Sequence, residues 1–202
     1  MTLDFLLTSL LVVISPGTGV LYTMASGLSQ GARASVIATV GCTLGAIPHL
    51  IAAISGLAIL LYTHDVAFHI LKYFGVIYLL YMAWGTLKEG ATLQVNDNAE
   101  AVPAWRVVTS GILLNLLNPK LTLFFFAFLP QFITPGRHAT SDMIELGLIF
   151  IAMTFIVFMG YGFFAVSIRH HVISRPSILI WMRRSFAFAF VLLGIKLASS
   201  AQ

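Results

Sequence analysis

The sequence contains few charged residues. Of its 202 residues, 9% are charged and 59% are hydrophobic, whereas a soluble domain carries about 25% charged residues. This composition predicts an all-α integral membrane protein, and the length leaves room for about six spans of roughly 20 residues each. The formal charge of +4 comes from basic residues in short loops. They are topology signals, so the expected surroundings are membrane lipid, and no nucleic-acid partner is expected.

Cysteine and deeply placed acidic residues are also scarce. The single Cys42 excludes a disulfide within the chain, and we interpret it as a packing residue. No Asp or Glu lies deep in a predicted span, so a metal site would lack its carboxylates. The chain has no phosphate-binding loop for ATP. We therefore expect no metal, no cofactor and no enzymatic reaction. The first basic residue is Arg33, so the N-terminal segment is interpreted as a span and not as a signal peptide.

One polar stretch interrupts a long apolar run. The run extends from about Trp105 to Pro130, and it contains Asn115, Asn118, Pro119 and Lys120 near its middle. A loop between two short helices is the alternative interpretation, but neither piece reaches the roughly 20 residues that a span needs. Proline also removes a backbone donor. We therefore predict one broken span with a polar midpoint, as in transporters whose discontinuous helices bind the substrate.

The other apolar segments complete a pattern of six spans in a single membrane domain, residues 1–202. Half one covers residues 1–88, a polar linker covers residues 89–104, and half two covers residues 105–202. The predicted spans are residues 3–24, 34–61, 66–87, 105–130, 143–168 and 185–201. A short connection is expected at residues 27–33.

The second span carries a small-residue pair and two candidate special positions. Gly41 and Gly45 form a GxxxG pattern, which allows close helix approach. Packing within the chain is the main interpretation, and a homo-oligomer interface is the alternative. Pro48 should kink this span. His49 is a candidate proton carrier, with a hydrogen bond to a neighbouring backbone as its structural alternative.

The basic residues are unequally divided between the two sides of the membrane. Seven lie on one side (Arg33, Lys88, Arg106, Arg169, Arg175, Arg183, Arg184), three on the other (Lys72, Arg137, Lys196), and Lys120 is within a span. The excess of basic residues marks the cytoplasmic side. Both termini are then predicted to lie outside.

The first span has a matching interruption. Ser15, Pro16, Gly17, Thr18 and Gly19 follow its start by about as many residues as Pro119 follows the start of the fourth span. Three spans per half require the second half to insert upside down. The sequence therefore predicts two inverted three-helix repeats with broken first and fourth helices.

The two breaks offer binding groups rather than reactive groups. Gly17 and Gly19 let a ligand approach the backbone, while Asn115 and Asn118 can donate and accept hydrogen bonds. Lys120 supplies a positive charge for an anion, and freed carbonyls can accept from an ammonium group. Such a site suits a zwitterion such as an amino acid. In the alternative, Lys120 bonds to the carbonyls at a helix end and touches no substrate. Proton coupling is weakly marked, with His49 and Asp4 as the candidates.

The same residues resemble a known family. Asn118-Pro119-Lys120, followed by Phe128-Leu129-Pro130-Gln131, together with Ser15-Pro16-Gly17, resembles the lysine exporter (LysE) superfamily, in particular its homoserine/threonine efflux branch. The resemblance covers most of the chain. It implies a proton-driven inner-membrane exporter of amino acids. Pro16, Gly17, Asn118, Pro119, Lys120, Pro130 and Gln131 match the family motifs. Thr18 and Gly19 depart from them, because the family usually has Pro and Asn at these two positions.

These observations predict a secondary exporter of amino acids or close derivatives. The predicted substrate site comprises Pro16, Gly17, Thr18, Gly19, Asn115, Asn118, Pro119 and Lys120. A transporter of another small solute such as a metal cation, a non-transporting membrane subunit and a membrane enzyme are the alternatives. The enzyme would need a nucleophile and a base on facing helices, and Ser15 or Ser55 with His49 is the only conceivable pair.

Overall fold

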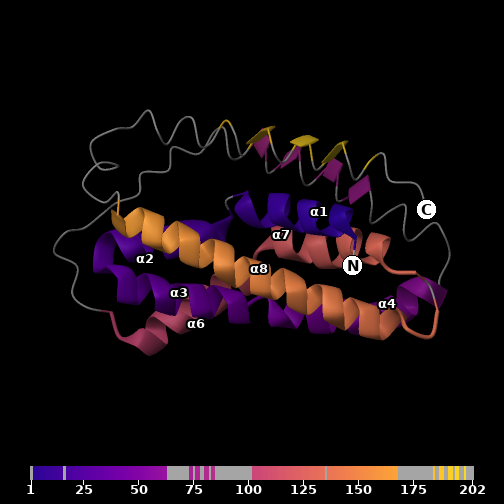
Figure 1. Ribbon diagram of the computed structural model, residues 1–202, viewed down its shortest axis with the longest axis horizontal. Coiled ribbons are helices and arrows are strands. Elements are labelled where there is room, and N and C mark those ends of the chain that lie inside the picture. Colours follow the sequence, from indigo (N-terminus) through magenta and orange to yellow (C-terminus); the bar gives the residue numbers. More distant parts are fainter. Residues whose placement is uncertain are drawn as a thin grey trace.

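The computed structural model describes a broken helical bundle (Figure 1). Every secondary-structure element in its described residues is a helix. The described residues are 2–15, 17–62, 73–74, 76–77, 80–81, 83–84, 102–134, 136–167, 184, 187–188, 191–192, 194–195 and 198. Most of the predicted third span, of the sixth span and of the linker lies outside them, so the number of spans and the inverted repeat remain predictions.

The first predicted span is broken where the sequence indicated. Helix α1 (Leu3–Ile14) begins at Thr2, whose hydroxyl accepts from the Phe5 N–H, and α2 (Thr18–Gln30) begins after Gly17. The two helices meet at a bend of 53°. Capping by Thr2 satisfies an amide that has no partner within the first turn of the helix. The break predicted at residues 15–19 is confirmed, because α1 ends at Ile14 and α2 begins at Thr18.

The end of the first span was predicted too early. We expected it to end near Met24, with a connection at residues 27–33, but α2 continues to Gln30 and α3 (Ala32–Leu44) starts two residues later. Gly31 alone makes the turn with a φ of 84°, a conformation that glycine adopts without strain. Four of the residues that suggested a loop, residues 27–30, are held in α2: Gly27 and Leu28 are buried, and the Ser29 hydroxyl donates to the Ala25 carbonyl.

The second span is nearly continuous. Helix α3 is followed by α4 (Ile47–Tyr62), with a short interruption at Gly45 and Ala46. The interruption lies just before Pro48, as expected for a residue that cannot donate to the preceding turn. Gly41 and Gly45 pack against α6 (Ala104–Leu116). A Cβ at Gly41 would lie 2.5 Å from the Val108 carbonyl oxygen, which confirms that this pair permits close packing within the chain.

The fourth predicted span is also broken. Helix α6 ends at Leu116, and α7 (Pro119–Leu123) continues at a bend of 49°. After α7 the helix widens into a π-helical turn, η1 (Phe124–Phe128), and then tightens into a 3₁₀ turn, η2 (Leu129–Phe132). Single π turns within helices often occur at functional sites.

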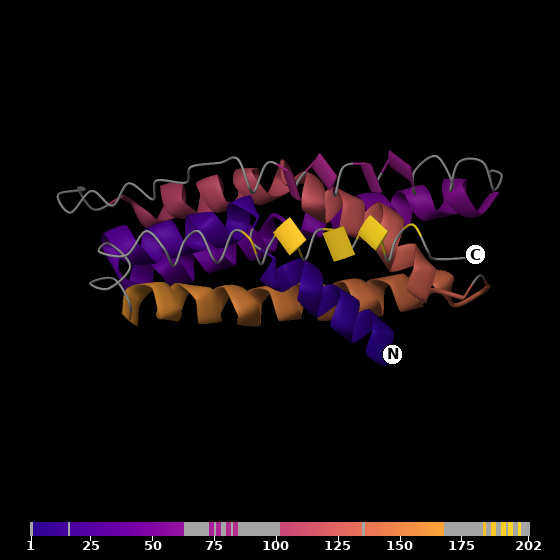
Figure 2. The same ribbon diagram turned by 90° about the horizontal axis from the view of Figure 1, so that it is seen from above.

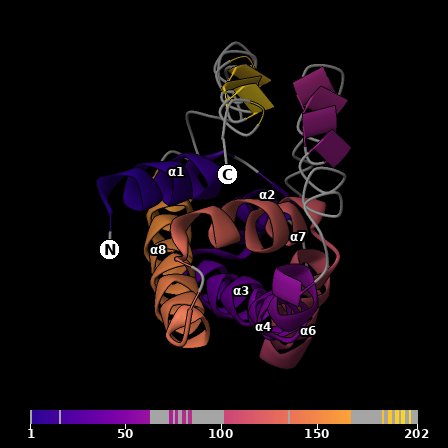
Figure 3. The ribbon, with the colours of Figure 1, turned by 90° about the vertical axis from the view of Figure 1, so that its right-hand side faces the viewer.

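The long helix α8 (Ala139–Ser167) packs against the broken first half. It starts before the predicted Met143, because Ala139 and Asp142 donate to the Gly136 and His138 carbonyls and complete an extra turn. Figure 2 shows α2 and α3 between α8 and α6. The contacts of α2 and α3 with α6 and α8 join the two halves of the chain. Figure 3 shows α7 between α1 and the side formed by α3, α4 and α6. The two helix breaks consequently lie at the centre of the bundle.

Several described helices are long and apolar enough to cross a membrane. Ala32–Gly56 and Ala139–Ser167 qualify alone, and the number rises to four if each bent pair is one span. Many large apolar side chains on their outer faces are exposed, including Leu3, Ile51, Leu117 and Ile156. Such faces are suited to lipid rather than to water.

Candidate functional site

The first helix break ends in two carbonyls that bind Lys120. In an α-helix the Val12 carbonyl would accept from the N–H of residue 16, but residue 16 is proline and has none. Lys120 Nζ donates to the Val12 carbonyl at 3.0 Å and to the Ser15 carbonyl at 2.6 Å. The Ser15 hydroxyl also donates to the Val12 carbonyl. Pro16 itself lies outside the described residues.

The second helix break has the same form. Pro119 leaves the Asn115 carbonyl without its regular helical donor. His49 Nε2 lies 3.1 Å from this carbonyl, which also accepts from the Asn118 N–H. Because a carbonyl only accepts, the hydrogen-bond network assigns the proton to Nε2. His49 Nδ1 lies 3.3 Å from the Thr122 hydroxyl, which can donate to it when the imidazole is neutral.

Two asparagine side chains connect these contacts. Asn115 Nδ2 donates to the Cys42 carbonyl at 2.7 Å, and Asn118 Nδ2 donates to Asn115 Oδ1 at 3.2 Å. Asn118 Oδ1 accepts from the backbone N–H of Lys120 and caps α7. Asn115, Asn118 and Lys120 are 0%, 3% and 5% exposed. A buried polar group is stable only when it is hydrogen-bonded, and each of these three side chains has partners.

Each break is therefore completed by a side chain from the other half of the chain. Lys120 in half two bonds to carbonyls of α1, and His49 in half one bonds to a carbonyl of α6. Further hydroxyls cross between the halves: among them, Thr18 donates to the Leu114 carbonyl, and Tyr161 donates to the Ile14 carbonyl at 2.7 Å. The two proline breaks form one connected polar centre.

Two glycines allow this centre to be compact. A Cβ at Gly17 would lie 3.2 Å from Asn118 Nδ2 and from Lys120 Nζ. A Cβ at Gly19 would lie 2.5 Å from Asn115 Oδ1 and 2.8 Å from Phe158 Cε2. An asparagine side chain at position 19 would overlap Asn115 in this arrangement. The departure of this chain from the family pattern at Gly19 therefore has a steric consequence at the site.

The chain is similar to a known family of translocators over most of its length. The profile of the family described as LysE type translocator matches residues 10–201. The chain belongs to this LysE family. A homoserine/homoserine lactone efflux protein of Salmonella typhimurium is 31% identical over 97% of this chain and 95% of its own length. A leucine efflux protein of Klebsiella pneumoniae is 29% identical over 78% of each chain. An uncharacterized membrane protein of Vibrio cholerae is 29% identical over 98% of this chain. No solved structure matches.

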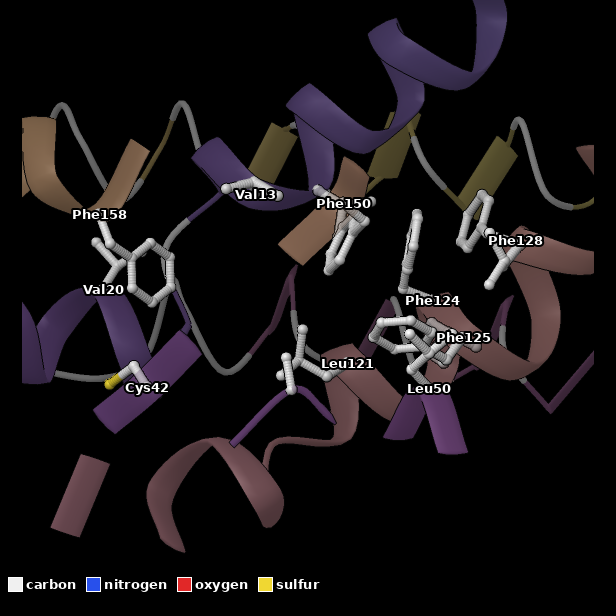
Figure 4. Close-up of a cluster of buried hydrophobic side chains, with 14 of the residues drawn as sticks. Val13, Val20, Cys42, Leu50, Leu121, Phe124, Phe125, Phe128, Phe150 and Phe158 are labelled. Carbon is white, nitrogen blue, oxygen red and sulfur yellow. The ribbon is translucent and has the colours of Figure 1, made fainter. Parts of the chain in front are cut away.

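Aromatic side chains form one wall of the polar centre in this LysE-family protein. Figure 4 shows Phe124, Phe125, Phe128 and Phe150 as one group, with Phe158 and Val20 nearer to Cys42. Phe125 stacks on His49 with ring planes 8° apart, and Phe124 stacks on Phe150 with ring centroids 3.8 Å apart. Phe125 therefore covers one face of the His49 ring.

The structure brings most of the predicted site residues together. Gly17, Gly19, Asn115, Asn118 and Lys120 form the centre, and the Thr18 hydroxyl reaches it from an exposed position. Pro119 begins α7. A role of these residues in binding substrate stays a prediction. The arrangement also matches the alternative for Lys120, a bond to the carbonyls at a helix end.

The two candidates for proton coupling lie in different places. His49 is within the polar centre and also bonds to a neighbouring backbone, which was its structural alternative. Asp4 lies in the first turn of α1, at the opposite end from Ser15, and its side chain is exposed. The structure therefore brings His49, but not Asp4, to the broken helices.

Sequence reasoning missed several members of the centre. The Val12 carbonyl could have been found, because it lies four residues before Pro16 and proline leaves that carbonyl free. Thr122 carried no such signal, since a threonine hydroxyl in an apolar helix usually bonds to its own helix. Tyr161 carried none either, because the partner of a tyrosine hydroxyl depends on which helix packs beside it. Within the described part of the chain, no three His, Cys, Asp or Glu side chains are grouped to hold a metal ion. The metal-cation alternative therefore finds no ligand set there.

Proposed function

We propose that this protein is a secondary active exporter of amino acids or close derivatives across the inner membrane of a bacterium. The observation that carries the proposal is the buried polar centre where two proline breaks meet. Membrane-buried polar residues are costly and are typical of substrate pathways. The efflux proteins for homoserine, homoserine lactone and leucine among the relatives support an amino acid as the substrate class.

The chemistry of the centre suits a zwitterion. Lys120 is a cation that can bind a carboxylate, and the carbonyls of Val12 and Ser15 can bind an ammonium group. The amides of Asn115 and Asn118 add donors and acceptors. The substrate would contact Gly17, Thr18, Gly19, Asn118 and Lys120 directly, while Pro16, Pro119 and Asn115 shape the breaks.

Transport requires the centre to open to each side in turn. We propose six spans in two inverted repeats, both termini outside, and rocking of one half against the other. The hydrogen bonds between α1 and α7 and between α4 and α6 join these halves, so they are the bonds that such a movement would break. The proton gradient would drive export, with His49 as the proposed proton carrier, because imidazole titrates near neutral pH.

An export assay tests the proposal. The chain is expressed in a strain that lacks its own amino-acid exporters, and intracellular accumulation is measured during challenge with a panel of amino acids and dipeptides. Accumulation of at least one amino acid should fall, and dissipating the proton gradient should abolish the effect. Lys120→Met should reduce export by about tenfold or more, because a buried charge partner of the substrate is lost. Unchanged accumulation across the panel, with the protein present in the membrane, would contradict export.

A further inference from the structure

Lys120 has an unusual set of partners for a buried cation. Its side chain is 5% exposed, and its Nζ donates to two backbone carbonyls. The described acidic residues are Asp4, Asp142 and Glu145, and all three are partly or fully exposed. Within the described part of the chain, Lys120 therefore has carbonyl partners but no carboxylate. A buried charge without an opposite charge is expensive, so the arrangement calls for an explanation beyond packing.

The carbonyls that hold Lys120 form a small site for an ammonium group. They lie at the C-terminal end of α1, where the helix dipole is negative and carbonyls lack helical donors. Pro16 frees the Val12 carbonyl, and the Ser15 carbonyl lies beside it. We call the Val12 and Ser15 carbonyl oxygens the α1 carbonyl pair. Any primary ammonium presents the same compact group of three donors as Lys120 Nζ.

We propose that the α1 carbonyl pair is the subsite for the substrate's primary ammonium group, and that Lys120 occupies it as an internal substitute when no substrate is bound. This inference rests on the proposed function and assigns a role to each pole of its site. On binding, the substrate's ammonium replaces Lys120 Nζ at the two carbonyls. The released Lys120 then pairs with the carboxylate of the same substrate molecule.

The exchange leaves the charge of the site balanced. A zwitterion brings one positive and one negative charge, so the net charge of the centre does not change. After the exchange, the substrate's ammonium is bound by the α1 carbonyl pair, and Lys120 is paired with the substrate's carboxylate instead of with neutral carbonyl oxygens. The interaction between two full charges in a buried site is stronger than that of one charge with carbonyls. The zwitterion therefore supplies the partner that the buried lysine lacks.

The surroundings of Lys120 permit this movement. Gly17 packs against the end of the lysine side chain, and a Cβ there would lie 3.2 Å from Lys120 Cε and Nζ, so any larger residue at this position would hinder the movement. The lysine stem is flexible, unlike the planar head of arginine. Asn118 Nδ2 would lie equally close to that Cβ, so an amide donor stands beside the released ammonium and can also bind the carboxylate.

The exchange predicts a selectivity that a purely structural lysine would not give. Removing the Lys120 charge frees the carbonyl pair and at the same time deletes the partner of the carboxylate. The affinity for an amine without a free carboxylate should then stay equal or rise, while the affinity for the zwitterion should fall. A lysine that only stabilises the end of α1 would affect both ligands in the same direction.

Binding to purified protein tests the proposal with three probes. The probes are homoserine, homoserine lactone, which keeps the amine but has no free carboxylate, and 2,4-dihydroxybutanoate, which keeps the carboxylate but has no amine. Wild-type protein should bind homoserine most tightly and 2,4-dihydroxybutanoate at least about tenfold more weakly. In Lys120→Met, the affinity for homoserine should fall about tenfold or more, while that for the lactone stays equal or rises.

Thr109→Val is the control. It removes an exposed hydroxyl that donates to the Trp105 carbonyl of its own helix, α6, and leaves the Lys120 charge in place, so the ratio of the two affinities should not change. Parallel losses for homoserine and its lactone in Lys120→Met would overturn the exchange. If Lys120→Met does not fold, the wild-type comparison decides: binding of 2,4-dihydroxybutanoate as tight as that of homoserine would refute an ammonium subsite. Wild-type protein that binds no amino acid at all, over the panel used for export, would instead overturn the proposed function and this inference with it.

Discussion

His49 donates through Nε2 to the backbone carbonyl of Asn115, 66 residues away in the sequence. That carbonyl is the one that Pro119 leaves without its regular helical donor. Lys120 Nζ likewise donates to the Val12 carbonyl, which Pro16 leaves without its regular helical donor. Each break in one half of this LysE-family chain is thus satisfied by a titratable side chain of the other half. Each of these carbonyls also accepts one local hydrogen bond, Val12 from the Ser15 hydroxyl and Asn115 from the Asn118 N–H. Lys120 and His49 therefore supply an additional donor at each break, in an apolar interior where underbonded carbonyls are unfavourable.

Replacing His49 should separate its structural role from its proposed proton role. His49→Leu removes the donor to the Asn115 carbonyl and should destabilise the protein by about 1–3 kcal/mol, seen as a lower melting temperature in detergent. His49→Gln keeps an N–H donor but cannot titrate, so it should retain more stability and lose the dependence of export on the proton gradient. Export by His49→Gln that still collapses with the gradient would contradict proton transfer by His49.

Thr122→Val is the matched comparison for these histidine variants. It removes the hydroxyl near His49 Nδ1 but leaves the bond between Nε2 and the Asn115 carbonyl. The loss of stability should therefore be smaller than in His49→Leu, about 1 kcal/mol. An equal or larger loss would place the main contribution at the hydroxyl and not at the freed carbonyl.

Gly19→Ala should disturb the polar centre directly. The added Cβ would lie 2.5 Å from Asn115 Oδ1 and 2.8 Å from Phe158 Cε2, so both side chains must move. Overpacking of this kind costs about 1–3 kcal/mol, measurable by thermal unfolding, and it should lower export because Asn115 is displaced.

Gly160→Ala is the control for this substitution. Gly160 also lies in a helix, α8, but an added Cβ there would have no neighbour within 4 Å. It should be neutral or stabilising by up to about 1 kcal/mol, since alanine favours helix more than glycine does. Equal effects of the two substitutions would contradict the close contact between Gly19 and Asn115.

The sequence predicts the breaks well because their cause is local. Pro16 and Pro119 lack an N–H whatever their surroundings, so each must free the carbonyl four residues earlier. The end of α2 was harder to predict, because Gly27 is buried beside Ser35 of α3 and the one-residue turn at Gly31 depends on the same packing. A small residue in a buried helix and one in a loop look the same in the sequence.

The partners within the centre could not be predicted for a different reason. Lys120 was expected to bind an anion, with helix-end carbonyls as the alternative, and the choice depends on the distance between α1 and α7. That distance follows from packing of elements more than 100 residues apart. Tyr161 is further evidence of this limit, since nothing in its own helix indicates a bond to Ile14.

The contact between α3 and α6 should be sensitive to a single methyl group. A Cβ at Gly41 would lie 2.5 Å from the Val108 carbonyl oxygen and 2.9 Å from Val108 Cα. These are backbone atoms and cannot rotate away, so Gly41→Ala must separate the two helices. We expect a loss of about 2 kcal/mol or more, at the upper part of the range for overpacking.

Gly56→Ala provides the comparison for Gly41. It lies in α4, and an added Cβ would make an ordinary contact at 3.5 Å with Phe126. Its melting temperature should stay within a few degrees of the wild-type value. If Gly41→Ala were as stable as Gly56→Ala, that result would contradict the close backbone contact between α3 and α6.

Cys42 reports whether the polar centre opens. It is the single cysteine of the chain, its side chain is fully buried, and its thiol lies 3.7 Å from the Gly19 carbonyl oxygen. A maleimide should therefore label it slowly in the folded protein and quickly after denaturation, because thiol reactivity requires access as well as a thiolate. Arg33→Cys in a Cys42→Ala background places a thiol at an exposed helix end and should react at once. If transport separates α2 from α6 around Asn115, adding substrate under a proton gradient should increase the rate at which Cys42 is labelled. Without substrate, labelling of Cys42 as fast as that of Arg33→Cys would contradict the closed packing of this centre.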